Sequence, residues 1–284
     1  HRQFTHSLFF IPFGALIVAA PIFLLVRKHL SFKNTYAASF FGYATHGLLD
    51  ACTSYGTVLF WPFSNERITW NNISIVDPLL TIPALILLAM AVKTNRRRFS
   101  FLAVGWIVSY LALGLFQYER ALSSGLKLAQ SRGHNAERMT LKPSFGNLIL
   151  WKSIYQHGDS FYVDAIRAGT TLSWCPGESI KIFDYQYHLP DLEENSQQRE
   201  DIERFRWFSQ DFLGFQNDKN LVTDVRYSMI PNQIAPMWGL IIDERKGTNE
   251  HAAWWESRNL DDESLILFKE MLLGHKCTAI KNGD

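Results

Sequence analysis

The chain has 284 residues, which is enough for two domains of ordinary size. Its 28 basic and 27 acidic residues leave a net charge of +1, so the composition indicates neither a nucleic-acid partner nor a strongly acidic one. The mean hydropathy of −0.06 averages an apolar N-terminal part with a polar C-terminal part. We therefore expect a membrane domain followed by an extramembrane domain.

Four apolar runs predict membrane-spanning helices, at residues 8–26, 36–62, 73–92 and 101–117. The first run is followed by further runs and by no small-residue cleavage site, which is not typical of a secretory signal peptide. Because the chain begins with His1, we expect the natural protein to be longer at its N-terminus.

Basic residues predict the orientation of these spans. Arg27, Lys28 and Lys33 follow the first run, and a cluster at residues 93–98 follows the third. The positive-inside rule places these two segments in the cytoplasm. The loop at 63–76 and everything after the fourth run are then expected outside the cytoplasm.

A polar helical connector begins at about residue 119 and leads into a region with strand patterning. Residues 148–155 and 161–166 flank a His-Gly-Asp-Ser turn and predict a β-hairpin. Further strands are expected at 179–185, 221–229 and 236–243, with a helix over 191–215. The predicted fold class is mainly α, with a multi-span helical membrane domain over 1–118 and a polar α+β domain over 119–284.

Cysteines are few. Cys52 falls in the second apolar run, whereas Cys175 and Cys277 both fall in the polar domain. In an oxidising compartment these last two can form a disulfide, although their spacing alone leaves the pairing open.

His46 and Asp50 are the most informative polar residues, because they lie in a stretch from Asn34 to Asn65 that holds no charged residue other than Asp50. An ionisable side chain at bilayer depth costs at least about 2.5–3.5 kcal/mol and usually marks a functional site. A spacing of four residues places the imidazole and the carboxylate one turn apart on the same helix face.

Two further histidines, His1 and His6, precede the first apolar run. Imidazole nitrogen and carboxylate oxygen are the ligands of catalytic zinc, and they also suit other divalent ions such as Mn²⁺. The sequence therefore predicts a divalent metal site, with zinc preferred, that includes His1, His6, His46 and Asp50. The alternative is a hydrogen-bonded His–Asp pair that locks packed helices together without a metal.

Other polar residues have simpler interpretations. Asp77 followed by Pro78 is typical of a helix N-cap, although Asp77 is also placed where it could join the metal site. Arg67 is expected to be a solvated loop residue, with phosphate binding as the alternative.

Several short motifs taken together resemble a known family. The chain is similar to bacterial inner-membrane metal-dependent hydrolases, also described as LexA-binding and membrane-associated, and in ligand pattern to the zinc-dependent phospholipase C and single-strand nuclease superfamily. The resemblance covers about residues 1–92 and rests on His1-Arg2-x-x-Thr5-His6-Ser7, Thr45-His46-x-x-x-Asp50, Thr53-Ser54-Tyr55-Gly56-Thr57, Trp61-Pro62-Phe63 and Val76-Asp77-Pro78.

This resemblance implies a membrane-bound hydrolase of phosphoesters or lipid headgroups in the bacterial inner membrane, with His1, His6, His46 and Asp50 as metal ligands. The family pattern begins upstream with an apolar segment that ends in Asp-x-Asp, and this chain starts after that element. Two other functional classes are compatible with the residues: a non-catalytic membrane scaffold that binds a protein partner, and a metal or proton transporter.

Overall fold

The computed structural model describes residues 3–258, 260–275 and 277–279. It has 46% helix and 19% strand. The chain forms two compact units, His1–Leu111 and Ala112–Asp284. The longest helix, α4 (Arg97–Ser131), continues from the first unit into the second. The observed division and the boundary predicted after residue 118 both lie within this helix.

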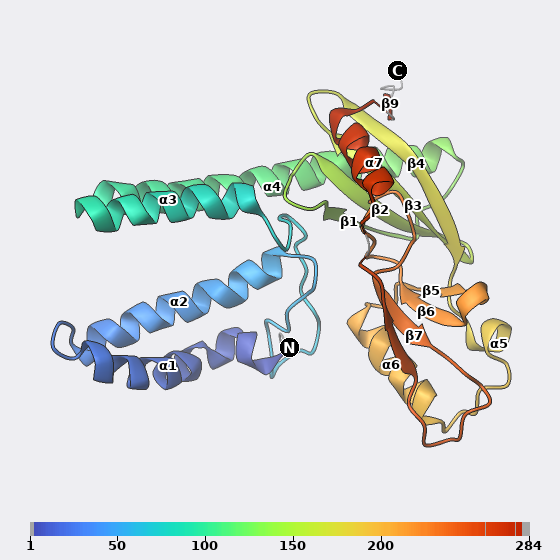
Figure 1. The fold of residues 1–284 in the computed structure, drawn as a ribbon, viewed down its shortest axis with the longest axis horizontal. Helices are drawn as coiled ribbons and strands as arrows, with labels where there is room; N and C mark the ends of the chain where they lie inside the picture. The colour runs from blue at the N-terminus through green and yellow to red at the C-terminus, as the bar shows by residue number, and fades with distance from the viewer. Residues whose placement is uncertain (1–2, 259, 276, 280–284) are drawn as a thin grey trace. The chain divides into compact units, whose positions relative to one another are not determined.

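The first unit begins with a helical hairpin (Figure 1). Two 3-10 turns, η1 (Phe4–His6) and η2 (Leu8–Phe10), lead into α1 (Ile11–Val26), and α2 (Phe32–Cys52) returns antiparallel to it. Close packing depends on Gly14, because a Cβ atom there would lie 2.5 Å from the Tyr43 ring. The antiparallel arrangement brings the start of α1 to the end of α2, where the predicted ligands lie.

An irregular loop over residues 53–77 connects α2 to α3 (Pro78–Thr94). The backbone N–H groups of Trp70 and Asn72 donate to Ala51 O and Cys52 O, which holds the loop against the end of α2. Arg67 is buried and donates to Tyr55 O at 2.6 Å, so the expectation of a solvated arginine is wrong. The buried Arg67 side chain thus holds the loop together by donating to a backbone carbonyl group inside it.

The predicted N-cap at Asp77 is confirmed. Its carboxylate accepts a hydrogen bond from Leu80 N at 3.1 Å, and Pro78 occupies the first helical position. The same carboxylate accepts from Tyr110 Oη on α4 at 2.8 and 2.9 Å. Asp77 therefore joins α3 to α4.

The prediction of a multi-span helical domain with a mainly α fold is wrong. By length and composition, two described helices are apolar enough to cross a membrane: Leu8–Val26 and Arg97–Ser131. The expected span at 36–62 fails because α2 ends at Cys52 and carries polar residues such as Thr45, His46 and Asp50. The expected span at 73–92 fails because α3 begins only at Pro78 and has 17 residues. A run with a single charged residue is therefore not by itself a continuous apolar helix.

The second unit contains an antiparallel sheet in the order β1-β2-β3-β4-β9. Its strands are β1 (Arg138–Pro143), β2 (Leu150–His157), β3 (Ser160–Ala168), β4 (Leu172–Lys181) and β9 (Thr278–Ala279). The predicted hairpin is confirmed, since His157 pairs with Ser160 across the turn between β2 and β3. On α4, Gln117 donates to Leu148 O and Ala168 O, which ties this helix to the sheet.

A second antiparallel sheet has the order β5-β6-β7-β8 and consists of β5 (Leu213–Gln216), β6 (Leu221–Asp224), β7 (Trp238–Ile241) and β8 (Ala253–Glu256). The helices α5 (Tyr185–His188) and α6 (Gln197–Phe208) and the 3-10 turn η3 (Asn217–Lys219) accompany it. Ile202 and Phe205 of α6 pack on Leu213 and Val222 in its core. The predicted helix over 191–215 is therefore too long at both ends, because α6 begins only at Gln197 and residues 213–216 form a strand.

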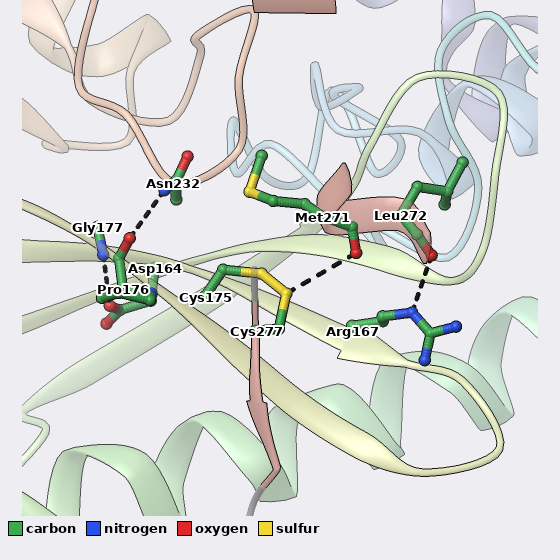
Figure 2. The surroundings of a disulfide bond; sticks show 9 residues. All are labelled: Asp164, Arg167, Cys175, Pro176, Gly177, Asn232, Met271, Leu272 and Cys277. Atoms are coloured by element: carbon green, nitrogen blue, oxygen red, sulfur yellow. Dashed lines mark hydrogen bonds between the residues drawn. A yellow bond between two sulfur atoms is a disulfide. The ribbon is translucent and has the colours of Figure 1, made fainter. Parts of the chain in front are cut away.

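The C-terminal helix α7 (Asp262–Leu273) packs on the first sheet, and a disulfide joins Cys175 of β4 to Cys277 (Figure 2). Arg167 of β3 donates to Leu272 O at 2.8 Å, at the end of α7. These contacts attach the C-terminal segment to the sheet across a sequence separation of 102 residues.

Candidate metal centre

The structure brings together three of the predicted ligands. His6 is the last residue of η1, and His46 and Asp50 lie one turn apart on α2. The two Nε2 atoms of the histidines are 3.1 Å apart. Asp50 Oδ2 lies 3.4 Å from His6 Nε2 and 3.7 Å from His46 Nε2. The ligand atoms thus form a small triangle at one end of the α1–α2 hairpin.

The size of this triangle fits one metal ion. Two atoms bound to the same tetrahedral zinc at 2.0–2.2 Å lie about 3.3–3.6 Å apart. The three separations of 3.1, 3.4 and 3.7 Å bracket this range. Two imidazoles and one carboxylate also match the ligand set of catalytic zinc sites, which leave a fourth position for water or substrate. The donor set therefore suits zinc by chemistry and by spacing.

Thr5 and Tyr43 orient the ligand from η1. Thr5 Oγ1 lies 2.9 Å from His6 Nδ1, so its hydrogen bond uses one ring nitrogen and directs Nε2 toward His46 and Asp50. Tyr43 Oη on α2 donates to Thr5 O at 2.6 Å and fixes the backbone of this segment. Partners of this kind set the tautomer and the ring orientation of a metal-binding histidine.

Gly47 permits η1 to lie close to α2. A Cβ atom at this position would be 2.8 Å from His6 O, which is too short for any real contact. Gly47 therefore allows η1 to pack closely on α2, but it provides no metal ligand itself. A glycine directly after a histidine inside a helix was the sequence signal for this close approach, and the sequence analysis missed it. The orienting roles of Thr5 and Tyr43 were also missed.

Replacing Gly47 with alanine is expected to displace His6 and weaken zinc binding by roughly 10–100-fold, the usual range when ligand orientation is lost. Competition with a zinc-sensitive chelator dye measures this affinity. Gly42→Ala is the matched control, because the same helix has nothing within 4 Å of a Cβ atom at that position. Equal affinities in the two variants would contradict the role of Gly47.

The cluster is open on one side. The His46 side chain is 66% exposed, whereas those of His6 and Asp50 are 14% and 16% exposed. Aromatic residues surround this end of the hairpin: Phe4 contacts Trp61 with ring centroids 5.6 Å apart, and Phe9 contacts the exposed Phe63 at 6.2 Å. A ligand can therefore approach the cluster from the side of His46.

The remaining predicted ligand, His1, lies outside the described residues. Asp77 is absent from the ligand cluster found among the described residues, because it caps α3. Zinc or manganese binding at His6, His46 and Asp50 remains a prediction that the geometry favours.

The described part of the chain combines two helices long and apolar enough to cross a membrane with a cluster of nitrogen and oxygen ligand atoms at the end of a helical hairpin. Residues 1–121 match the family model described as YdjM inner membrane protein. The match covers less than half of the chain, and it includes all four predicted ligand positions. This N-terminal part of the chain is thus similar to a family described as an inner membrane protein. The description names no activity, and the similarity to hydrolases or phospholipase C is not part of it.

No curated protein and no solved structure matches the chain.

Proposed function

We propose that the protein is a metal-dependent hydrolase of the inner membrane. The observation that carries this proposal is the triangle of His6, His46 and Asp50 ligand atoms, 3.1–3.7 Å apart and exposed on one side. A bound zinc ion would supply a Lewis acid and a water molecule acidified to a pKa of about 7. His46 and Asp50 hold two of the ligand positions from one rigid helix, and Thr5 orients the third ligand.

We infer that the substrate is a phosphoester, with a lipid headgroup as the favoured source. The ligand cluster lies beside exposed aromatic side chains, including Phe4, Phe9 and Phe63. Trp61, whose ring contacts that of Phe4 at 5.6 Å, belongs to the residue types that concentrate at the level of lipid headgroups. The 3-10 turn η1, which ends at His6, lies directly before the apolar segment Leu8–Val26, which also places the cluster at the end of a candidate span.

We further propose that the metal centre and the second unit both lie outside the cytoplasm. Arg27, Lys28 and Lys33 gather at the opposite end of the α1–α2 hairpin from the cluster, and such residues favour the cytoplasmic side. The disulfide between Cys175 and Cys277 independently favours an oxidising compartment for the second unit.

Hydrolysis assays on detergent-purified, zinc-loaded protein test the proposed activity. We expect turnover of bis(p-nitrophenyl) phosphate and of phospholipid in mixed micelles. This turnover should stop with EDTA, return with added zinc, and fall by at least about 100-fold in Asp50→Asn, because a neutral amide is a weaker metal ligand than a carboxylate. Activity on the soluble phosphodiester but not on phospholipid would indicate a soluble phosphoester substrate.

Two results would overturn the hydrolase proposal. A folded wild type that retains zinc but hydrolyses neither substrate would indicate transport or a structural metal. A folded wild type that binds no metal after reconstitution would indicate a scaffold in which His6, His46 and Asp50 form a polar lock between packed segments.

A further inference from the structure

A buried lysine meets a serine in the second unit. Lys152 lies on β2, and Ser228 lies in the loop between β6 and β7. Lys152 Nζ is 2.8 Å from Ser228 Oγ. Successive side chains on a strand point to opposite faces, so Lys152 shares a face with Leu150 and Ile154, while Trp151 points to the other face and contacts Tyr118 of α4. Strand alternation therefore directs the lysine toward the loop.

The lysine is positioned by a third group. Its side chain is 4% exposed, and Nζ also donates to Gln233 O at 2.7 Å. Ser228 is only partly buried. A nucleophile within hydrogen-bond reach of a base that is oriented by a third group is the general arrangement of nucleophilic catalysis, and serine–lysine pairs are one of its variants.

The loop that carries Ser228 is anchored at both ends. Before the serine, Arg226 forms a buried ion pair with Asp224 at 2.7 Å and donates to Phe208 O at 2.8 Å. After the serine, Asn232 Nδ2 donates to Pro176 O of β4 at 2.8 Å (Figure 2). Ile234 N donates to Glu178 Oε2 at 2.7 Å. These contacts hold the serine at a fixed position relative to Lys152.

We propose that Ser228 is a nucleophile and Lys152 its general base in a second hydrolytic site, which acts on the carbonyl carbon of an ester or amide. Ser228 Oγ bonds to the carbonyl carbon while its proton passes to Lys152 Nζ. The bond to the leaving group then breaks, and the leaving group takes that proton. Water then attacks the acyl-serine. This step releases a carboxylic acid and restores the hydroxyl group of Ser228.

Two backbone N–H groups next to the serine are the candidate donors for the charge that develops on the carbonyl oxygen. In the described part of the chain, the N–H groups of Ser228 and Met229 donate no hydrogen bond to protein. The Ser228 hydroxyl donates a hydrogen bond to Ile230 O at 2.6 Å, which is its acceptor while the lysine is an ammonium group. A neutral amine at Lys152 offers the hydroxyl a second acceptor.

The charge state of Lys152 sets the expected pH dependence. Burial lowers the pKa of Lys152 to about 7, and the facing carboxylates of Glu178 and Asp224 oppose this shift. Lys142, its neighbour across the β1–β2 pair, is also buried, and burial lowers its pKa as well; its Nζ contacts the Tyr227 hydroxyl at 3.1 Å. Because only the neutral amine accepts a proton, the reaction should accelerate as pH rises through about 7.

Hydrolysis of p-nitrophenyl acetate by the full chain in detergent tests this proposal, with EDTA present to exclude the metal centre. We expect Ser228→Ala and Lys152→Met each to lower the rate by at least about 100-fold, the lower limit of a general-base contribution. Acid quenching followed by peptide mass spectrometry should find the acetyl group on Ser228.

Two variants serve as matched controls. Lys142→Met also removes a buried lysine from the neighbouring strand, and Ser179→Ala removes an exposed serine of β4; both should retain the wild-type rate within about threefold, as expected for groups outside the proton transfer. A wild-type rate in Ser228→Ala, acetylation only at lysines, or a folded wild type without turnover between pH 6 and 9 would overturn the proposal. None of these outcomes bears on zinc binding or on phosphoester hydrolysis.

Discussion

Replacing His46 with alanine is expected to abolish stable zinc binding while leaving the fold intact. Loss of groups that merely orient a metal ligand already costs roughly 10–100-fold in affinity, so loss of a ligand should cost more than about 100-fold. The fold should tolerate the change within about 0.5 kcal/mol, because the His46 side chain is 66% exposed. Elemental analysis of purified protein gives the metal content, and circular dichroism checks the fold.

His29→Ala is the appropriate control for this experiment. His29 is an exposed histidine in the same unit, in the turn after α1, and it is not part of the ligand cluster. The control should retain zinc at the wild-type stoichiometry. Equal zinc contents in the two variants would show that any bound metal lies elsewhere.

Reduction of the disulfide is expected to lower the free energy of unfolding of the second unit by about 2–5 kcal/mol. The bridge closes a long loop, with a sequence separation of 102 residues, and in the chain-entropy account long loops gain most from closure. Hydrogen exchange at the amides of β2 and β3 measures this change locally, with and without reductant, on the full chain in detergent.

Cys277→Ser separates loss of the bridge from other effects of the reductant. This variant should be destabilised to the same extent as reduced wild type, and adding reductant should not lower its free energy of unfolding any further. The unreduced wild type should show one reactive thiol after unfolding, that of Cys52, out of three cysteines. Three reactive thiols would contradict the bridge and remove one argument for an oxidising compartment.

The parts of the fold that the sequence predicted are those set by local chemistry. Asp77 followed by Pro78 specified a helix start, because the cap and the first-turn proline act within a few residues. The β2–β3 hairpin was predicted because strand alternation flanks a turn at residues 157–160. The short strands β5 and β8 were missed because they become strands only by pairing with β6 and β7.

The extent of the candidate spans was harder to predict. An uncharged stretch favoured a span over 36–62, yet residues 53–62 fold as a loop held by backbone hydrogen bonds to the end of α2. Such bonds depend on residues such as Trp70 and Asn72, which come later in the chain. A low charge alone therefore did not distinguish a spanning helix from a loop packed against the end of a helix.

The candidate site was accessible to sequence reasoning only in part. Helical spacing placed His46 and Asp50 on one face, as the structure shows, because this relation is local. The approach of His6 to within 3.4 Å of Asp50 depends on the packing of η1 over Gly47, which no spacing rule gives. The pairing of Lys152 with Ser228 joins positions 76 residues apart and was likewise beyond the reach of pattern analysis.

The Cys175–Cys277 bridge also determines how the second unit responds to proteolysis. The entire β5–β8 sheet lies within the covalent ring that this bridge closes. A protease that cuts once within the ring, for example in the exposed turn between β7 and β8, opens it but leaves both pieces bonded. The severed chain therefore cannot lose its C-terminal fragment until a reductant reaches the bridge or a second cut frees a segment. A nicked molecule in an oxidising compartment would keep all of its parts.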